Sequence, residues 1–150
     1  MSAGCAGTQV SPSTPVLDLT LNGLDGRNLE LSALRGKPVL LFLFATYDPI
    51  SQIALTPLLA AGKSESRVTI IGVAVQPDAR EFLGPFAKAL EVPFALYYDG
   101  SGALLHGKTK LGALPGVPLY IAVDAEGYVH GTFYGVAKAK DLEALIDSAE

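Results

Sequence analysis

Two runs of apolar residues constrain the fold of this chain most strongly. Residues 39–44 are continuously apolar and residues 68–75 are nearly so. Strands with apolar side chains on both faces are typical of a sheet that is covered on both sides. Between the runs, Asp48 precedes Pro49, which is a favoured helix start, and a helix is predicted over residues 49–61. This strand–helix–strand order predicts a layered α/β domain.

Shorter patterns on either side of this unit predict the remaining elements. The predicted strands are 16–21, 28–31, 94–98, 119–123 and 128–134. The predicted turns are 22–26, a single helical turn at 33–35 capped by Ser32, and a hairpin turn at 125–127. The further predicted helices are one starting at Asp78 with Phe82, Phe86 and Leu90 on one face, 103–111, and 141–149. Pro57 and Gly84-Pro85 are expected to kink, bend or break the helices that contain them.

Charge and composition exclude several classes of function. The chain has 150 residues, 49% of them hydrophobic and 17% charged, which favours one packed domain. The net charge of −4 leaves no basic footprint for nucleic acid. No apolar run reaches the ~18 residues that a membrane span needs.

Four motifs, taken in order, resemble segments of one known family. They are Pro15–Leu19 with Leu24-Asp25-Gly26, Leu31–Val39, Val92-Pro93-Phe94 with Asp99-Gly100, and Gly116–Gly127. Together they resemble the thioredoxin-like redoxins, in particular the TlpA-like and alkyl hydroperoxide reductase/thiol-specific antioxidant branch. The resemblance implies a thioredoxin-like three-layer α/β fold over residues 15–150. That fold has an N-terminal β-hairpin, a central mixed sheet and flanking helices.

The same resemblance exposes a missing pair of cysteines. Where the family carries Cys-x-x-Cys, this chain reads Asp48-Pro49-Ile50-Ser51. Thiol–disulfide exchange requires a thiolate, which neither Asp48 nor Ser51 can supply. In the family, the proline that kinks this helix usually lies five residues after the second cysteine, whereas Pro57 lies six residues after Ser51. Moving the second cysteine position to Gln52 for this reason does not recover a cysteine. A peroxiredoxin-style alignment on Thr46 puts Pro49 at the reactive position, with the same result.

Other chemistry at Asp48 and Ser51 has less support than helix capping. A serine nucleophile needs a nearby base, and the chain contains only His106 and His130. Asp48 with one histidine would make a weak metal site. We therefore expect no catalytic residue, metal or cofactor, and the balance leans away from an enzyme.

The resemblance also points to a surface for recognising polypeptide. It implies that Pro118 is cis and that the backbone of Val117 faces a bound chain. Tyr47, Pro49 and Ile50, with Leu114 and Pro115 near Val117 and Pro118, would then form an apolar ridge suited to an extended peptide. Simple packing of the loops is the alternative.

Cys5 is the one cysteine of the chain. Ala3-Gly4-Cys5 resembles the end of a bacterial lipoprotein signal, although no apolar signal segment precedes it in the sequence. Residues 1–14 then predict a flexible tail and lipid-anchored tether, which would place the domain in the cell envelope, facing the periplasm. The alternative is a free thiol on a protein of the cytoplasm.

Two hypotheses for the function follow. The first is a redox-inactive, thioredoxin-like envelope protein that binds polypeptide and touches the membrane only through a lipid at Cys5. The alternative is a thiol–disulfide oxidoreductase or peroxiredoxin-type antioxidant that uses non-standard groups or Cys5. The roughly ten-residue linker could bring Cys5 to the Pro118 loop at ~3.3 Å per residue.

Overall fold

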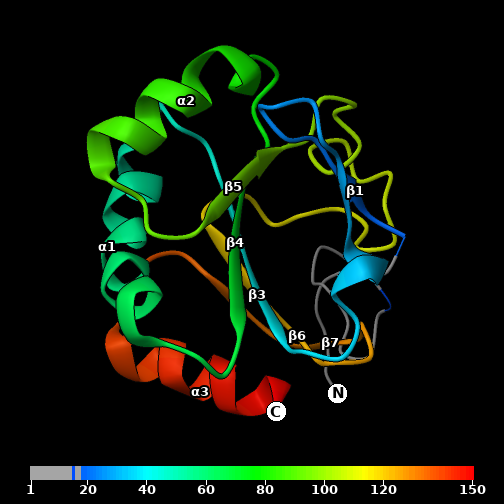
Figure 1. Cartoon of the computed structure of the whole chain (residues 1–150), viewed down its shortest axis with the longest axis vertical. Coiled ribbons are helices and arrows are strands. Elements are labelled where there is room, and N and C mark those ends of the chain that lie inside the picture. The colour runs from blue at the N-terminus through cyan, green and yellow to red at the C-terminus, as the bar shows by residue number, and fades with distance from the viewer. Residues whose placement is uncertain (1–14, 16–17) are drawn as a thin grey trace.

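The computed structural model describes residue 15 and residues 18–150 (Figure 1). Its centre is a five-stranded sheet in the order β5-β4-β3-β6-β7. The strands are β3 (Val39–Phe44), β4 (Thr69–Ala74), β5 (Ala95–Tyr98), β6 (Leu119–Val123) and β7 (Val129–Tyr134). β3, β4 and β5 are parallel, whereas β6 and β7 are antiparallel to their neighbours. The predicted mixed sheet is therefore confirmed, with the two apolar runs at its centre.

Three helices cover one face of this sheet, as Figure 1 shows. They are α1 (Pro49–Ser64), α2 (Ala79–Leu90) and α3 (Ala139–Ala149). Alternate residues of β3, including Phe42 and Phe44, pack against them because successive side chains of a strand point to opposite faces. Phe42 stacks on Phe44, and Phe44 stacks on Phe86 of α2.

The opposite face is covered without an α-helix. A hairpin of β1 (Thr20–Leu21) and β2 (Leu29–Glu30), a short 3₁₀ turn η1 (Leu31–Leu34) and the 99–118 loop lie there. Leu41 and Leu43 of β3 face this layer, where they join Leu104 and Leu111 of the loop. The molecule thus has three layers, with the sheet in the middle.

Two local predictions were wrong. Residues 103–111 form turns, because the Asp99 carboxylate accepts the N–H of Ser101 and of Leu104, and because Gly102 and Gly107 adopt positive φ. Positive φ does not continue a right-handed helix. Ser32 lies within η1 and does not cap it; Glu30 occupies the cap position without a side-chain bond.

The other boundaries agree within a few residues. α1 runs on to Ser64 through Pro57, and α2 is a single helix through Gly84 and Pro85. The predicted tail over residues 1–14, with Cys5, lies outside the described residues, as do residues 16–17 of the first predicted strand. Within the described part of the chain, no helix is both long and apolar enough to cross a bilayer.

Candidate functional site

The candidate site lies where the carboxyl end of β3 meets the amino end of β6. Leu43 pairs with Leu119 in an antiparallel register, so the chain that leaves β3 passes the chain that enters β6. The first segment leads to Asp48 and α1, and the second contains Val117-Pro118. The peptide bond between Val117 and Pro118 is cis, as predicted.

Asp48 caps α1 as predicted. Its backbone is extended, its Oδ1 accepts the Ile50 N–H at 3.3 Å, and its Oδ2 accepts the Ser51 N–H at 3.1 Å. Oδ2 also accepts the Ser51 hydroxyl at 2.9 Å. The carboxylate is therefore engaged with the first turn of the helix, where negative charge is favourable.

Ser51 is committed to the same turn. Its side chain is buried, and the residue is 1% exposed. The hydroxyl donates to Asp48 and accepts the N–H of Ala45 at 3.3 Å. A buried serine hydroxyl with both bonds made inside the protein does not reach a substrate. Asp48 and Ser51 therefore serve the structure of the helix start.

Gln76 joins this turn to the start of α2. It is 3% exposed and follows β4 in the chain. Its Oε1 accepts the buried Thr46 N–H, and its Nε2 donates to Asp78 Oδ1 at 3.0 Å. Gln52 of α1 donates to the carbonyl of the same Thr46 at 2.9 Å. Sequence reasoning missed Gln76, because a lone glutamine after a strand carries no local signal for a bond 30 residues away.

The predicted peptide-binding residues differ in exposure. Tyr47 is 70% exposed, and Pro49 and Ile50 are also exposed. Val117 is half-buried and packs against the hairpin-side core, whereas Pro118 is buried. Pro118 can therefore shape the loop, while the other four can offer surface.

Both loop segments of this site, at Tyr47 and at residues 114–117, leave backbone groups available. Among the hydrogen bonds of the described residues, none involves the backbone of Tyr47 or of residues 114–117. Exposed N–H and C=O groups beside apolar side chains are what an extended peptide pairs with.

Neither histidine completes a catalytic pair with Ser51. His130 Nε2 lies 2.6 Å from Asp124 Oδ2, beyond the end of β6 where Val123 pairs with Val39. That is the opposite end of the sheet from Ser51. The His106 ring contacts the Gly102 carbonyl at 2.9 Å, within the 99–118 loop. Both side chains are exposed.

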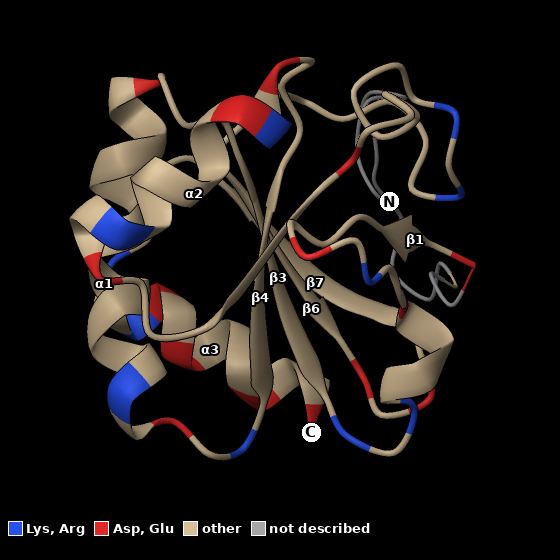
Figure 2. Cartoon of the chain, turned by 45° about the horizontal axis from the view of Figure 1, so that its top comes forward, with Lys and Arg blue, Asp and Glu red and all other residues tan. Residues whose placement is uncertain are grey.

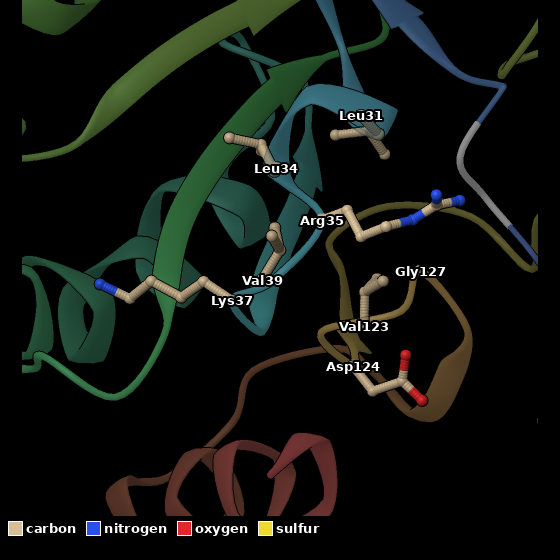
Figure 3. Close-up of a pocket in the computed structure, with 8 residues that line it drawn as sticks. All are labelled: Leu31, Leu34, Arg35, Lys37, Val39, Val123, Asp124 and Gly127. Carbon is tan, nitrogen blue, oxygen red and sulfur yellow. The ribbon is translucent and has the colours of Figure 1, made fainter.

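A small hollow at that opposite end carries two basic residues but has little room. Figure 3 shows Val39 and Val123 at its centre, with Arg35 and Lys37 extending in different directions. Its volume is about 10 Å³, which is room for about one water molecule. This hollow is too small to hold a ligand.

A larger apolar groove adjoins the candidate site, between Tyr47 and α2. Its volume is about 440 Å³, within the range typical of ligand pockets. Phe82, predicted only as part of an apolar helix face, lines it and is 48% exposed. Sequence periodicity identified the apolar face of α2 but could not show that part of it stays uncovered.

The comparisons with known proteins agree with this geometry. The Redoxin family model matches residues 8–146. DsbF of MTB superposes with a TM-score of 0.71 at 24% identity, covering 89% of this chain and 96% of that one. A thiol:disulfide interchange protein from Chlorobium tepidum gives a TM-score of 0.74 at 20% identity, covering 93% and 97%.

A third similar structure is the exposed lipoprotein thioredoxin Etrx1 of Streptococcus pneumoniae. Its TM-score is 0.71 at 22% identity, with 87% of this chain and 98% of that one covered. The comparison with curated proteins found no significant match. At these identities the structural likenesses show the fold, which is the thioredoxin-like arrangement that the motifs predicted.

Proposed function

Because the chain belongs to the Redoxin family but has no cysteine at residues 48 and 51, we propose that it binds polypeptide without exchanging disulfides. The bound segment is extended and lies against Tyr47, Pro49, Ile50 and Val117, beside Pro118. The protein is then a binding module that keeps the redoxin scaffold.

One observation carries the proposal: Asp48 and Ser51 bond to each other and to the α1 turn. Disulfide exchange proceeds by attack of a thiolate on sulfur, through a mixed disulfide. A carboxylate and a buried hydroxyl cannot form that intermediate. Their bonds stabilise the helix start, so the scaffold persists without the chemistry.

The surface beside this pair supports polypeptide binding. Tyr47 and Ile50 are large apolar side chains that remain exposed, and large exposed apolar groups that gather mark interaction sites. The uncommitted backbone of residues 114–117 leads into β6, whose first residue pairs with the end of β3 that leads to Tyr47. An extended segment can satisfy those groups by strand-like pairing while its side chains contact Tyr47 and Ile50.

The proposed location is the bacterial cell envelope, with a lipid on Cys5. The motif Ala3-Gly4-Cys5 supports this location, as does the likeness to a protein described as an exposed lipoprotein thioredoxin. Intact mass of the protein extracted from native membranes tests it. A lipid adduct on Cys5 supports the anchor, whereas an unmodified Cys5 overturns it.

Activity assays separate this proposal from an oxidoreductase. We expect no insulin-disulfide reduction and no peroxide turnover above buffer, with either the natural chain or Cys5→Ser. Turnover that Cys5→Ser abolishes would instead establish the tail thiol as catalytic. Turnover that survives Cys5→Ser but fails in Asp48→Ala would point to non-standard groups.

Binding is tested by capture of partners from solubilised envelopes, followed by mass spectrometry. Tyr47→Ala and Val117→Asp should lose the captured polypeptides. Tyr128→Ala is the matched control, because Tyr128 is also exposed but lies on the β6–β7 hairpin at the other end of the sheet. Equal loss in all three variants would contradict a binding surface at Val117.

A further inference from the structure

The groove between Tyr47 and α2 has an apolar wall and one charged group. It is lined by Thr46, Tyr47, Gln76, Asp78, Phe82, Pro85, Phe86 and Ala89. Tyr47 is 70% exposed and Phe82 is 48% exposed, and an apolar group that covers them would remove that surface from water, which is favourable. Asp78 is the one ionisable carboxylate among the lining residues.

The side chain of Asp78 makes no hydrogen bond to the helix that this residue starts. Asp78 occupies the cap position of α2, yet its side chain accepts no N–H of that helix. Its backbone, at φ −100° and ψ 22°, is not in the extended region from which a cap side chain reaches back. Instead, its Oδ1 accepts a hydrogen bond from Gln76 Nε2 at 3.0 Å, and Asp78 is among the residues that line the groove.

This arrangement has a defined complement. An aromatic or large aliphatic side chain fits the wall of Phe82, Pro85 and Phe86, and a cation beside it pairs with the Asp78 carboxylate. Figure 2 shows acidic and basic residues interspersed along the ribbon of the chain. Among the residues that line the groove, Asp78 is the one with a charged side chain, so the groove carries a single negative charge.

We propose that the groove receives a large apolar side chain of the partner polypeptide, and that Asp78 pairs with a basic residue next to it. This inference rests on the proposed function, since Tyr47 both lines the groove and belongs to the proposed peptide surface. The favoured ligand is then an extended segment in which a residue such as Phe or Leu neighbours Lys or Arg.

The N-terminal part of the same chain does not fit this description. Residues 1–26 contain no lysine or arginine, and no aromatic residue precedes Phe42. A segment of another polypeptide is therefore the better occupant. A second copy of the protein is the competing occupant, and the experiment below distinguishes it.

The probes are three acetylated, amidated hexapeptides that differ at two central positions: Ser-Gly-Phe-Lys-Gly-Ser, the same peptide with Ala for Phe, and the same with Glu for Lys. Affinities are measured by NMR titration with the full chain. We expect the Ala peptide to bind about tenfold more weakly, as loss of an anchor side chain predicts. The Glu peptide should also bind more weakly, and Asp78→Asn should remove that discrimination.

Ala89→Asp tests the apolar wall at an exposed position, where the fold tolerates a charge. It should remove the preference for Phe over Ala while circular dichroism stays unchanged. Equal binding of all three peptides to the natural chain, or no binding of any, would overturn the groove assignment.

The dipeptide N-acetyl-Phe-Lys-amide separates this inference from the proposed function. It can occupy the groove but is too short to pair along residues 114–117. One outcome would keep the groove and reject the extended-peptide function: the dipeptide shifts the resonances of the groove residues, the hexapeptides bind no more tightly than the dipeptide, and Val117→Asp does not change either affinity. Concentration-dependent dimerisation in sedimentation that Ala89→Asp abolishes would assign the groove to a second copy and overturn the proposal.

Discussion

Helices α1 and α2 both begin after an aspartate, yet the two aspartates do different things. Asp48 has an extended backbone, and its carboxylate accepts two N–H groups and one hydroxyl of the α1 turn. Asp78 has a different backbone conformation, and its side chain accepts no N–H of α2. Its carboxylate bonds to Gln76 and lines the groove.

The difference teaches that residue type alone does not make a cap. A cap residue whose side chain bonds to the first turn typically has an extended backbone. At Asp48 that condition is met, and the aspartate serves stability. At Asp78 it is not met, and the carboxylate remains available for a ligand. Four changes test how far this contrast holds.

The largest expected effect comes from installing cysteines. In a Cys5→Ser background, Asp48→Cys with Ser51→Cys should bring insulin reduction from background to a measurable rate. A thiol at residue 48 would lie at a helix N-terminus, which lowers its pKa, and beside the cis Val117-Pro118 loop.

The same spacing at the other helix is its control. Asp78→Cys with Glu81→Cys places two thiols at the start of α2, away from Pro118. We expect this variant to stay near background. Equal rates for the two pairs would mean that the cis loop contributes nothing to the geometry of the site.

Gln76→Leu should cause the largest loss of stability, because it leaves the buried N–H of Thr46 without its acceptor. An unsatisfied buried donor costs about 1–3 kcal/mol. Urea unfolding of the two proteins measures the difference. Gln52→Leu is the matched control, since Gln52 binds the carbonyl of the same Thr46 but is exposed, and its loss should cost less.

Asp48→Ala should lower the free energy of unfolding by about 0.5–2 kcal/mol, the usual cost of removing a helix cap. It removes the acceptor of the Ile50 and Ser51 N–H groups. The same urea titration measures it. A change below the error of the titration would show that Ser51 alone can hold the turn.

Asp78→Ala should have the smallest effect on stability, about 0.5 kcal/mol, the low end of the net contribution of one hydrogen bond, because its exposed side chain accepts one bond from Gln76 and none from α2. The carboxylate it removes bonds only to Gln76 among the described residues. A loss as large as that of Asp48→Ala would show that the two aspartates serve their helices equally and would remove the contrast.

Much of the scaffold was predictable because its signals are local. The apolar run of β3 and the pair Asp48-Pro49 determine the structure of the few residues around them. The strand and the helix start were therefore both predicted correctly. The helix predicted over residues 103–111 failed because Asp99 binds the backbone that follows it, which competes with helix formation.

The groove was beyond local signals. Phe82 repeats with Phe86 at helical spacing, and that pattern predicts an apolar face without saying how far the neighbouring loop covers it. The structure buries Phe86 partly against the core and leaves Phe82 exposed. The Thr46–Tyr47 turn, which Gln76 bonds across 30 residues of sequence, lines the open part together with α2, and such a contact leaves no local signal in the sequence.

The amide proton of Thr46 gives the protein a built-in reporter. It points at Gln76 Oε1, and the other end of that side chain holds Asp78. A ligand that draws on the Asp78 carboxylate changes the polarisation of the Gln76 amide group, and with it the shielding of the Thr46 proton. A single resonance in a nitrogen-edited spectrum thus registers groove occupancy from inside the core, without a label on the ligand.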